Sequence, residues 1–529
     1  MQADIALING NMITINPSKP QAQAVAIKDN KIIQMGTNRE IKPLIKEKTK
    51  VIDLKGKTVL PGFIDTHIHV AGFGKALTEI GLRGIQSIKE MQEKLKKRVE
   101  KTREEEWILG HGWDQDRLKE RRYPTRWDLD KFSPNNPVLI TRVCGHLCVV
   151  NSKALKKAGI TEKTSPPPGG KIDKNPKTGD PTGILRENAM DLVQRMVPEP
   201  SEQQLMNACS LACQKAVESG LTSVHWIIHS PAEIHVIQKL RAQNKLPLRV
   251  YILIPVKFVD HLIHLSLSTG FGDDIVRIGA VKIFMDGSLG ARTAALHESY
   301  SDNTSTRGML LYSEEKLKEL IMKIHRAGLQ LAVHAIGDRA IDVVLAALEK
   351  ALKKIPREDH RHRIEHASVL SEKLIRRMKR LGVIASVQPH FVVSDFWIMD
   401  RLGSKRARWV YPFKALIQEG VRTVGGSDCP VEPISPLLGI WAAVSRELFP
   451  EERVSVEEAL RMYTIDAAFA SFEEKVKGSI EVGKLADLVV LSRDPRRVSP
   501  DEIKDLAVET TFVGGRMVYG NSEYVERQR

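Results

Sequence analysis

The sequence predicts an α/β fold in which a TIM barrel is joined to a composite β-sandwich from both ends of the chain and carries a long insertion. Between residues 60 and 476, apolar strand-like runs alternate with helical stretches, and eight such strands can be counted. Eight strands alternating with helices are typical of a TIM barrel, whose active site lies at the carboxyl ends of its strands. Both ends of the chain show only short β-rich runs separated by turns.

The composition indicates a globular protein with more than one domain. The chain has 529 residues, of which 42% are hydrophobic, enough to fill the cores of two or more domains. The formal net charge is +15, but Lys and Arg are spread among Glu on the helical faces. This distribution favours a solvated surface over nucleic-acid binding, and it is compatible with a weak attraction for anionic substrates.

Cysteine usage and hydropathy favour the cytoplasm. The five cysteines are too few and too scattered for a disulfide framework, which is typical of a reducing compartment. We find no uncharged apolar run of membrane-spanning length, and the chain starts with a strand-like run at residues 5–8 rather than a signal peptide. We therefore expect a cytoplasmic protein that binds neither membranes nor nucleic acids; the sequence is compatible with a homo-oligomer.

The two ends of the chain resemble each other in pattern. Residues 3–14 and 24–33 near the start, and 486–491 and 511–519 near the end, are short β-rich runs with Asn-Gly, Asp-Asn and Gly-Gly turns. We predict that residues 1–59 and 477–529 build one β-sandwich domain and that residues 60–476 form the barrel domain.

The first predicted barrel strand, residues 63–67, leads into the most informative motif, Pro-Gly-Phe-Ile-Asp-Thr-His-Ile-His at 61–69. Successive strand side chains point to opposite faces, so His67 and His69 share a face and can bind one metal ion together. A His-x-His pair alone is a weak signal. A second copy, His360 and His362, is interpreted as incidental.

The connection after this strand, residues 75–200, is far longer than an ordinary loop, and such insertions are often lids or binding elements. It contains Trp113, and its Pro- and Gly-rich part at 165–183 is expected to be an ordered loop or hairpin. Cys144, His146 and Cys148 alternate along one strand face and could imitate a zinc site, but a structural zinc site would need a fourth ligand.

Four further polar residues lie at the ends of predicted strands, where catalytic groups of a barrel belong. Lys282 lies in an otherwise apolar strand, His334 and His366 end two others, and Asp428 follows the last. Each histidine alone could be a core residue. His225 and His229 share a face of a predicted strand, and we expect both to belong to the core or to a pocket wall. The predicted barrel strands are 63–67, 223–228, 250–254, 278–285, 329–334, 363–366, 383–387 and 422–427.

These motifs together resemble the amidohydrolase superfamily of metal-dependent hydrolases. The phrases His-Gly-Trp-Asp-Gln at 111–115, Cys-Gly-His at 144–146, Asp-Gly-Ser-Leu-Gly at 286–290 and Gly-Ser-Asp-Cys-Pro at 426–430 resemble the branch typified by N-substituted formamide deformylases. The resemblance covers nearly the whole chain and implies a metal set, matched by position: His67, His69, Lys282, His334, His366 and Asp428.

Lys282 needs a physical explanation, because a buried lysine is costly unless it is paired or uncharged. Its neutral amine could react with carbon dioxide to give N6-carboxylysine, whose two oxygens would bridge two cations, as in related binuclear amidohydrolases. The alternatives are an ion pair with a carboxylate such as Asp286, and a Schiff-base lysine.

The resemblance implies hydrolysis of a C–N amide-type bond, an N-acyl or N-formyl amide, in a small-molecule substrate. One divalent ion would be held by His67, His69 and Asp428 and a second by His334 and His366. Lys282 and the attacking hydroxide would bridge them. Asp428 would pass the hydroxide proton to the leaving amine. Zinc suits such imidazole-rich sites, with manganese, iron or cobalt as alternatives.

Two residues of the insertion are predicted to contact the substrate. Trp113 offers apolar area, and His146 can hydrogen-bond a carbonyl or its oxyanion. The alternative is that Trp113 packs the core of the insertion and His146 only ends a strand.

Two other functions remain open at this stage. The same metal set could hydrolyse a lactone or a phosphoester. The barrel could also be a catalytically silent binding or regulatory protein, although all six expected ligands are present.

Overall fold

The computed structural model describes residues 2–115, 117–143, 145, 147–167 and 170–520. The chain divides into two compact units: Met1–Val70 with Ala212–Arg529, and Ala71–Leu211. No helix among the described residues is long and apolar enough to cross a membrane.

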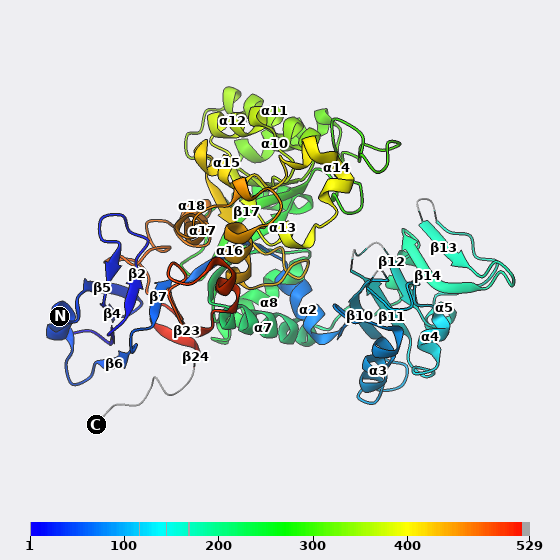
Figure 1. The fold of residues 1–529 in the computed structure, drawn as a ribbon, viewed down its shortest axis with the longest axis horizontal. Helices are drawn as coiled ribbons and strands as arrows, with labels where there is room; N and C mark the ends of the chain where they lie inside the picture. The colour runs from blue at the N-terminus through cyan, green and yellow to red at the C-terminus, as the bar shows by residue number, and fades with distance from the viewer. Residues whose placement is uncertain (1, 116, 144, 146, 168–169, 521–529) are drawn as a thin grey trace. The chain divides into compact units, whose positions relative to one another are not determined.

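The first unit contains an eight-stranded parallel sheet that forms a nearly closed barrel (Figure 1). The edge strands approach each other where Thr66 Oγ1 donates to the Gly425 carbonyl at 3.0 Å and Asp428 N donates to the His67 carbonyl at 2.7 Å. Each strand overlaps one predicted from the sequence, so the barrel is confirmed. In sheet order the strands are β8 (Phe63–Ile68), β15 (Leu221–Ile227), β16 (Arg249–Pro255), β17 (Val276–Phe284), β18 (Gln330–Ala335), β19 (Arg363–His366), β20 (Ile384–Val387) and β21 (Thr423–Gly425).

Helices alternate with these strands, and their boundaries follow local capping chemistry. In α12 (Glu372–Leu381), the Ser371 hydroxyl accepts from Leu374 N, and Gly382 at φ 67° ends the helix in the left-handed region that glycine tolerates. The other helices of this part are α7 (Glu202–Glu218), α8 (Pro231–Ala242), α9 (Val259–His264), α10 (Glu314–Arg326), α11 (Asp338–Lys354), α13 (Phe391–Ser394), α14 (Ile398–Ala407), α15 (Phe413–Gln418), α16 (Pro436–Ser445), α17 (Val456–Met462) and α18 (Ile465–Ala470).

Strands from both ends of the chain form two further sheets. One has the order β5-β4-β1-β6, and the other has the order β24-β23-β22-β7-β2-β3, in which β7 and β22 pair antiparallel. Leu7 and Val25 of the first sheet share a hydrophobic core with Val490 and Phe512 of the second. The strands are β1 (Ile5–Ile8), β2 (Asn11–Ile13), β3 (Gln21–Ala22), β4 (Ala24–Lys28), β5 (Lys31–Gly36), β6 (Lys50–Asp53), β7 (Thr58–Pro61), β22 (Leu488–Leu491), β23 (Val508–Val513) and β24 (Arg516–Gly520).

These sheets belong to the same compact unit as the barrel. A β-sandwich that folds as a domain of its own therefore stays a prediction.

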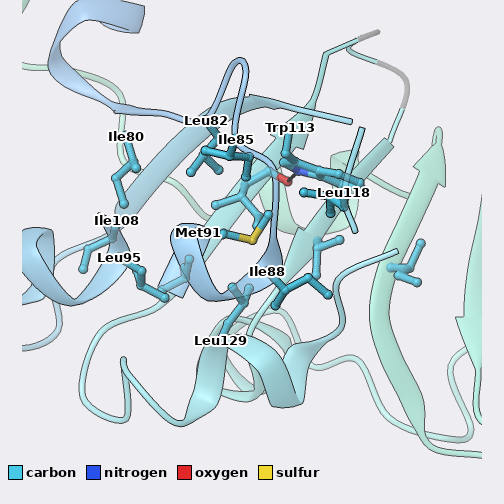
Figure 2. Close-up of a cluster of buried hydrophobic side chains, with 14 of the residues drawn as sticks. Ile80, Leu82, Ile85, Ile88, Met91, Leu95, Ile108, Trp113, Leu118 and Leu129 are labelled. Carbon is cyan, nitrogen blue, oxygen red and sulfur yellow. Dashed lines mark hydrogen bonds between the residues drawn. The ribbon is translucent and has the colours of Figure 1, made fainter. Parts of the chain in front are cut away.

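The second unit has its own sheet, with the order β13-β14-β12-β11-β10-β9, and its own hydrophobic core (Figure 2). The Pro- and Gly-rich segment forms a hairpin in which β13 and β14 pair antiparallel. Its elements are α2 (Val70–Thr78), β9 (Ile80–Gly81), α3 (Ile88–Val99), β10 (Ile108–Trp113), α4 (Arg126–Asp130), β11 (Val138–Arg142), β12 (Leu147–Val150), α5 (Ser152–Lys157), β13 (Gly170–Lys174), β14 (Pro181–Glu187) and α6 (Asp191–Gln194).

Candidate metal centre

The predicted ligands lie at the carboxyl end of the barrel. His67 lies in β8, and His69 follows the end of that strand. Lys282 lies two residues before the end of β17, and His366 is the last residue of β19. Asp428 comes three residues after β21 rather than at its end, and its backbone N–H donates to the His67 carbonyl, which brings the two side chains together.

His67, His69 and Asp428 form a compact group of potential ligands. One ligand atom from each lies within 4.8 Å of the others. Asp428 Oδ1 is 3.3 Å from His67 Nε2 and 3.1 Å from His69 Nε2. Two imidazoles and a carboxylate at such spacing can share one divalent ion.

His334 and His366 form the neighbouring pair. Their ring centroids are 4.4 Å apart, and the His366 ring is 4.9 Å from that of His67. His334 Nε2 lies 3.0 Å from the Gly287 carbonyl, which can only accept, so Nε2 carries the proton and Nδ1 keeps its lone pair. The buried His366 Nδ1 has no hydrogen-bond partner among the described residues. Both histidines thus retain a nitrogen that can bind a metal.

Two of the proposed ligands have left-handed backbone conformations. His366 has φ 72° and Asp428 has φ 57°, values that non-glycine residues adopt at a cost. Such residues concentrate at functional sites, where the surrounding structure holds a side chain in a required direction.

Lys282 is buried without a polar partner. The side chain is 1% exposed, and Nζ has no hydrogen-bond partner among the described residues. Burial lowers the pKa of Lys282 to about 8, although the carboxylates of Glu365 and Asp428 oppose this shift. The neutral amine is therefore accessible near physiological pH.

The carboxylate of Asp286 is engaged elsewhere and does not pair with Lys282. It accepts hydrogen bonds from the backbone N–H groups of Ala295 at 2.9 Å, Ile336 at 3.0 Å and Gly337 at 2.8 Å. It thereby ties the loop after β17 to the loop after β18. An ion pair between Asp286 and Lys282, which we considered from the sequence, is not found.

The protonation states around the site suit metal binding. Burial lowers the pKa of His334 to about 3, and it also lowers the pKa values of His69 and His366. Burial alone would raise the pKa of Asp428, but the neighbouring histidines, His67 first, hold it well below its usual range. Neutral imidazoles beside an ionised carboxylate are the forms that bind divalent cations. The residues present therefore fit such ions.

A sequence model of the amidohydrolase family matches residues 50–519. The chain belongs to the amidohydrolase family. The family predicted from the sequence motifs is thus confirmed.

Individual relatives agree with this assignment. The chain is 36% identical to a metal-dependent hydrolase from Pyrococcus furiosus, described as uncharacterized; the two structures have a TM-score of 0.78, over 93% of this chain and 100% of that one. It is 31% identical to the N-substituted formamide deformylase of Arthrobacter pascens, over 98% of either chain. It is also 35% identical to the protein LONG AFTER FAR-RED 3 of Arabidopsis thaliana, over 98% of this chain and 92% of that protein.

In this amidohydrolase, a buried ion pair that our sequence analysis missed supports His67. Glu365 Oε2 lies 2.5 Å from His67 Nδ1, and Glu365 is fully buried and bonded to Arg363. An ionised carboxylate accepts from Nδ1–H, which leaves His67 Nε2 free to face Asp428 and a metal. Arg363 also donates to His225 Nδ1 at 2.8 Å. The sequence signal that could have predicted this ion pair is the presence of two charged residues, Arg363 and Glu365, on one face of the short strand β19.

His225 in β15 and His229, two residues after that strand, have different surroundings. His225 is fully buried and bonded to Arg363, as expected of a core residue. His229 instead lies beside the site, with its Nε2 2.9 Å from Nδ1 of His69. Burial, followed by the charges of His69 and nearby lysines, lowers the pKa of His229 to about 4.

The two residues predicted to bind substrate have different outcomes. Trp113 is fully buried in the core of the second unit, where its indole N–H donates to the Ile140 carbonyl at 3.2 Å (Figure 2). These contacts are those expected from the alternative interpretation, in which Trp113 is a core residue of the insertion. A role for Trp113 in substrate binding stays a prediction. His146 lies outside the described residues, as does Cys144.

Proposed function

We propose that this amidohydrolase cleaves a C–N amide-type bond, an N-acyl or N-formyl amide, with two divalent metal ions, zinc by preference. The observation that carries the proposal is the buried, unpartnered Lys282 beside a cluster of four histidines and Asp428. The similarity to an N-substituted formamide deformylase supports C–N hydrolysis over other bond types. Manganese, iron or cobalt could replace zinc.

In this proposal the ligands divide into two groups that Lys282 would join. His67, His69 and Asp428 would hold one ion, and His334 and His366 the other. When bound, the metal ions would lower the pKa of a water molecule and polarise the scissile carbonyl.

Lys282 can join the two groups after reaction with carbon dioxide. The lone pair of neutral Nζ forms a bond to the carbon, and one proton is released, leaving an anionic N6-carboxylysine with two oxygens. This removes the cost of a buried ammonium and would supply negative charge to the metal ions that the neighbouring residues would hold. The lowered pKa of Lys282 favours the amine form that reacts.

Asp428 has the position to move the proton. Its carboxylate is ionised and lies at hydrogen-bond distance from His69 and near His67. It can accept a proton from the attacking water and donate it to the departing nitrogen, because an amide nitrogen leaves poorly unless it is protonated. Glu365 holds His67 in the required tautomer throughout.

We further propose that the protein acts in the cytoplasm on a small molecule. Cys148 and Cys213 are free and buried, which suits a reducing compartment.

A substrate panel tests this function. The purified protein is analysed for metals and assayed with N-formyl amides, N-acetyl amides, cyclic amides, lactones and phosphoesters. We expect the amides to be hydrolysed and chelation to abolish the activity. Activity on lactones or phosphoesters alone would replace the proposed bond. A metal-loaded protein inactive on every compound would favour a binding or regulatory role.

A further inference from the structure

An aromatic side chain lies beside each histidine of the second ligand pair. The Phe284 ring, at the end of β17, has its centroid 5.3 Å from that of His334 and 4.8 Å from Lys282 Nζ. The Phe391 ring, at the start of α13, has its centroid 6.4 Å from that of His366. One ring from a strand and one from a helix thus lie near the pair.

These rings are accessible rather than packed away. Phe284 is 40% exposed, and Phe391 is half-buried. Leu311, which is 51% exposed, donates its backbone N–H to the carbonyl of Met285, the residue after Phe284. Apolar surface left accessible beside a reactive centre is available to a ligand.

Several polar groups near Phe284 and Phe391 in the chain have partners of their own. His390, which precedes Phe391, is bonded to Glu432. Arg292 and Arg401 both bond Asp302, Arg292 at 3.0 Å. These polar groups are therefore engaged with partners of their own, and the apolar side chains are what these loops offer to a substituent of the substrate.

We propose that Phe284, Phe391 and Leu311 form a subsite for a large, uncharged apolar group attached to the scissile amide. The apolar group would lie against the two rings while the amide lies at the metal ligands. This inference rests on the proposed amide hydrolysis and names the class of amide: one with an aryl or long alkyl substituent, rather than one with an ionised group.

Matched substrates test the subsite. N-acetyl-methylamine is compared with N-acetyl-2-phenylethylamine, in which the apolar group is on the amine side, and with N-methyl-3-phenylpropanamide, in which it is on the acyl side. We expect at least one phenyl compound to raise kcat/KM by about tenfold or more, the change expected for burying about 60 Å² of apolar surface. The side that gains identifies which part of the substrate the rings contact. No gain on either side, with N-acetyl-methylamine still hydrolysed, would overturn the subsite and leave amide hydrolysis standing.

Variants separate a contact with the ligand from a structural effect. Phe284→Ala should remove most of the phenyl preference without changing the metal content, and Phe284→Leu should retain part of it. Phe271→Ala is the matched control. Phe271 is also an exposed phenylalanine, at 62%, but it lies before the start of β17, whereas Phe284 is at the end of that strand. A phenyl preference that survives in Phe284→Ala and Phe391→Ala would contradict the assignment.

Equilibrium binding tests the subsite independently of turnover. Calorimetry on the metal-loaded protein compares acetohydroxamate with 3-phenylpropionohydroxamate, which carries the ring on the acyl side, and with N-(2-phenylethyl)acetohydroxamate, which carries it on the nitrogen. We expect at least one phenyl compound to bind about tenfold more tightly to the wild type and to lose this advantage in Phe284→Ala. Equal affinities of all three compounds would overturn the proposal even if no amide substrate were cleaved.

Discussion

At the scale of single residues, Asp428 is the group on which the chemistry depends most. Its left-handed backbone conformation directs the carboxylate to both His67 and His69. Asp428→Asn keeps the shape and one possible ligand oxygen but removes the proton acceptor. We expect kcat to fall at least about 100-fold while much of the metal is retained. Steady-state kinetics with metal analysis measures both, and a near-normal kcat would exclude Asp428 as the base.

Glu365 is predicted to act through His67 rather than on the substrate. In Glu365→Gln the amide can still hydrogen-bond, but it no longer fixes the tautomer or supplies a negative charge. Metal affinity should weaken about 10- to 100-fold. Glu372→Gln is the control, since Glu372 also pairs with an arginine but is exposed. Equal metal affinity in the two variants, measured by competition with a chelator, would contradict the role.

Among single residues, some members of the candidate site could be predicted from the sequence and others could not. The six expected ligands were predicted from their positions near the ends of predicted strands and from the family resemblance. The roles of Glu365 and His229 could not be found in this way. Glu365 contacts a histidine 298 positions earlier in the chain, and His229 contacts one 160 positions earlier. Such partners become visible only once the strands are placed side by side.

At the scale of elements, strand identity was more predictable than strand ends. Strand β19 has the predicted limits, whereas β21 is only Thr423–Gly425 against a prediction of 422–427. The shorter β21 leaves Asp428 on a loop instead of a strand end. Backbone hydrogen bonds to β8 decide this, and a local sequence pattern does not contain them.

The loop after β20 contains a pH-sensitive element at Asp395. Burial raises the pKa of Asp395 to about 7, although the Tyr411 hydroxyl donates to it at 2.6 Å. The folded protein keeps this proton up to about pH 7, whereas the unfolded chain releases it near pH 4, so stability falls as the pH rises between these values.

Asp395→Asn removes this dependence, because its amide oxygen can still accept from Tyr411 without ionising. The melting temperature of the variant relative to the wild type should therefore be higher at pH 8 than at pH 5. Asp400→Asn, an exposed position on α14, serves as the control. If the melting temperatures of Asp395→Asn and the wild type differed by the same amount at pH 5 and pH 8, Asp395 would not keep its proton in the folded protein.

At the scale of the whole molecule, the sequence predicted that the two chain ends meet, and strands β7 and β22 do pair. Outside the barrel, the order of the strands in the sheets could not be predicted from the sequence. That order depends on backbone hydrogen bonds between strands that are far apart in the chain. The insertion was predicted by its length, and it forms a compact unit of its own.

The predicted lid function of the insertion is tested best through His146. His146→Ala should lower kcat/KM while the metal content and melting temperature stay nearly unchanged, because an imidazole that contacts the substrate contributes little to packing. Trp113→Ala should instead lower the melting temperature, since it removes a fully buried side chain from a core. A normal kcat/KM in His146→Ala would exclude that residue from substrate binding.

We propose that Lys282 joins two metal ions into one catalytic centre. Elemental analysis of the wild type and of Lys282→Ala, purified side by side, tests it most directly. We predict two metal ions per wild-type chain and no more than about one in the variant, together with loss of most activity and partial recovery when a short carboxylate is added. Unchanged metal content in Lys282→Ala would contradict the account.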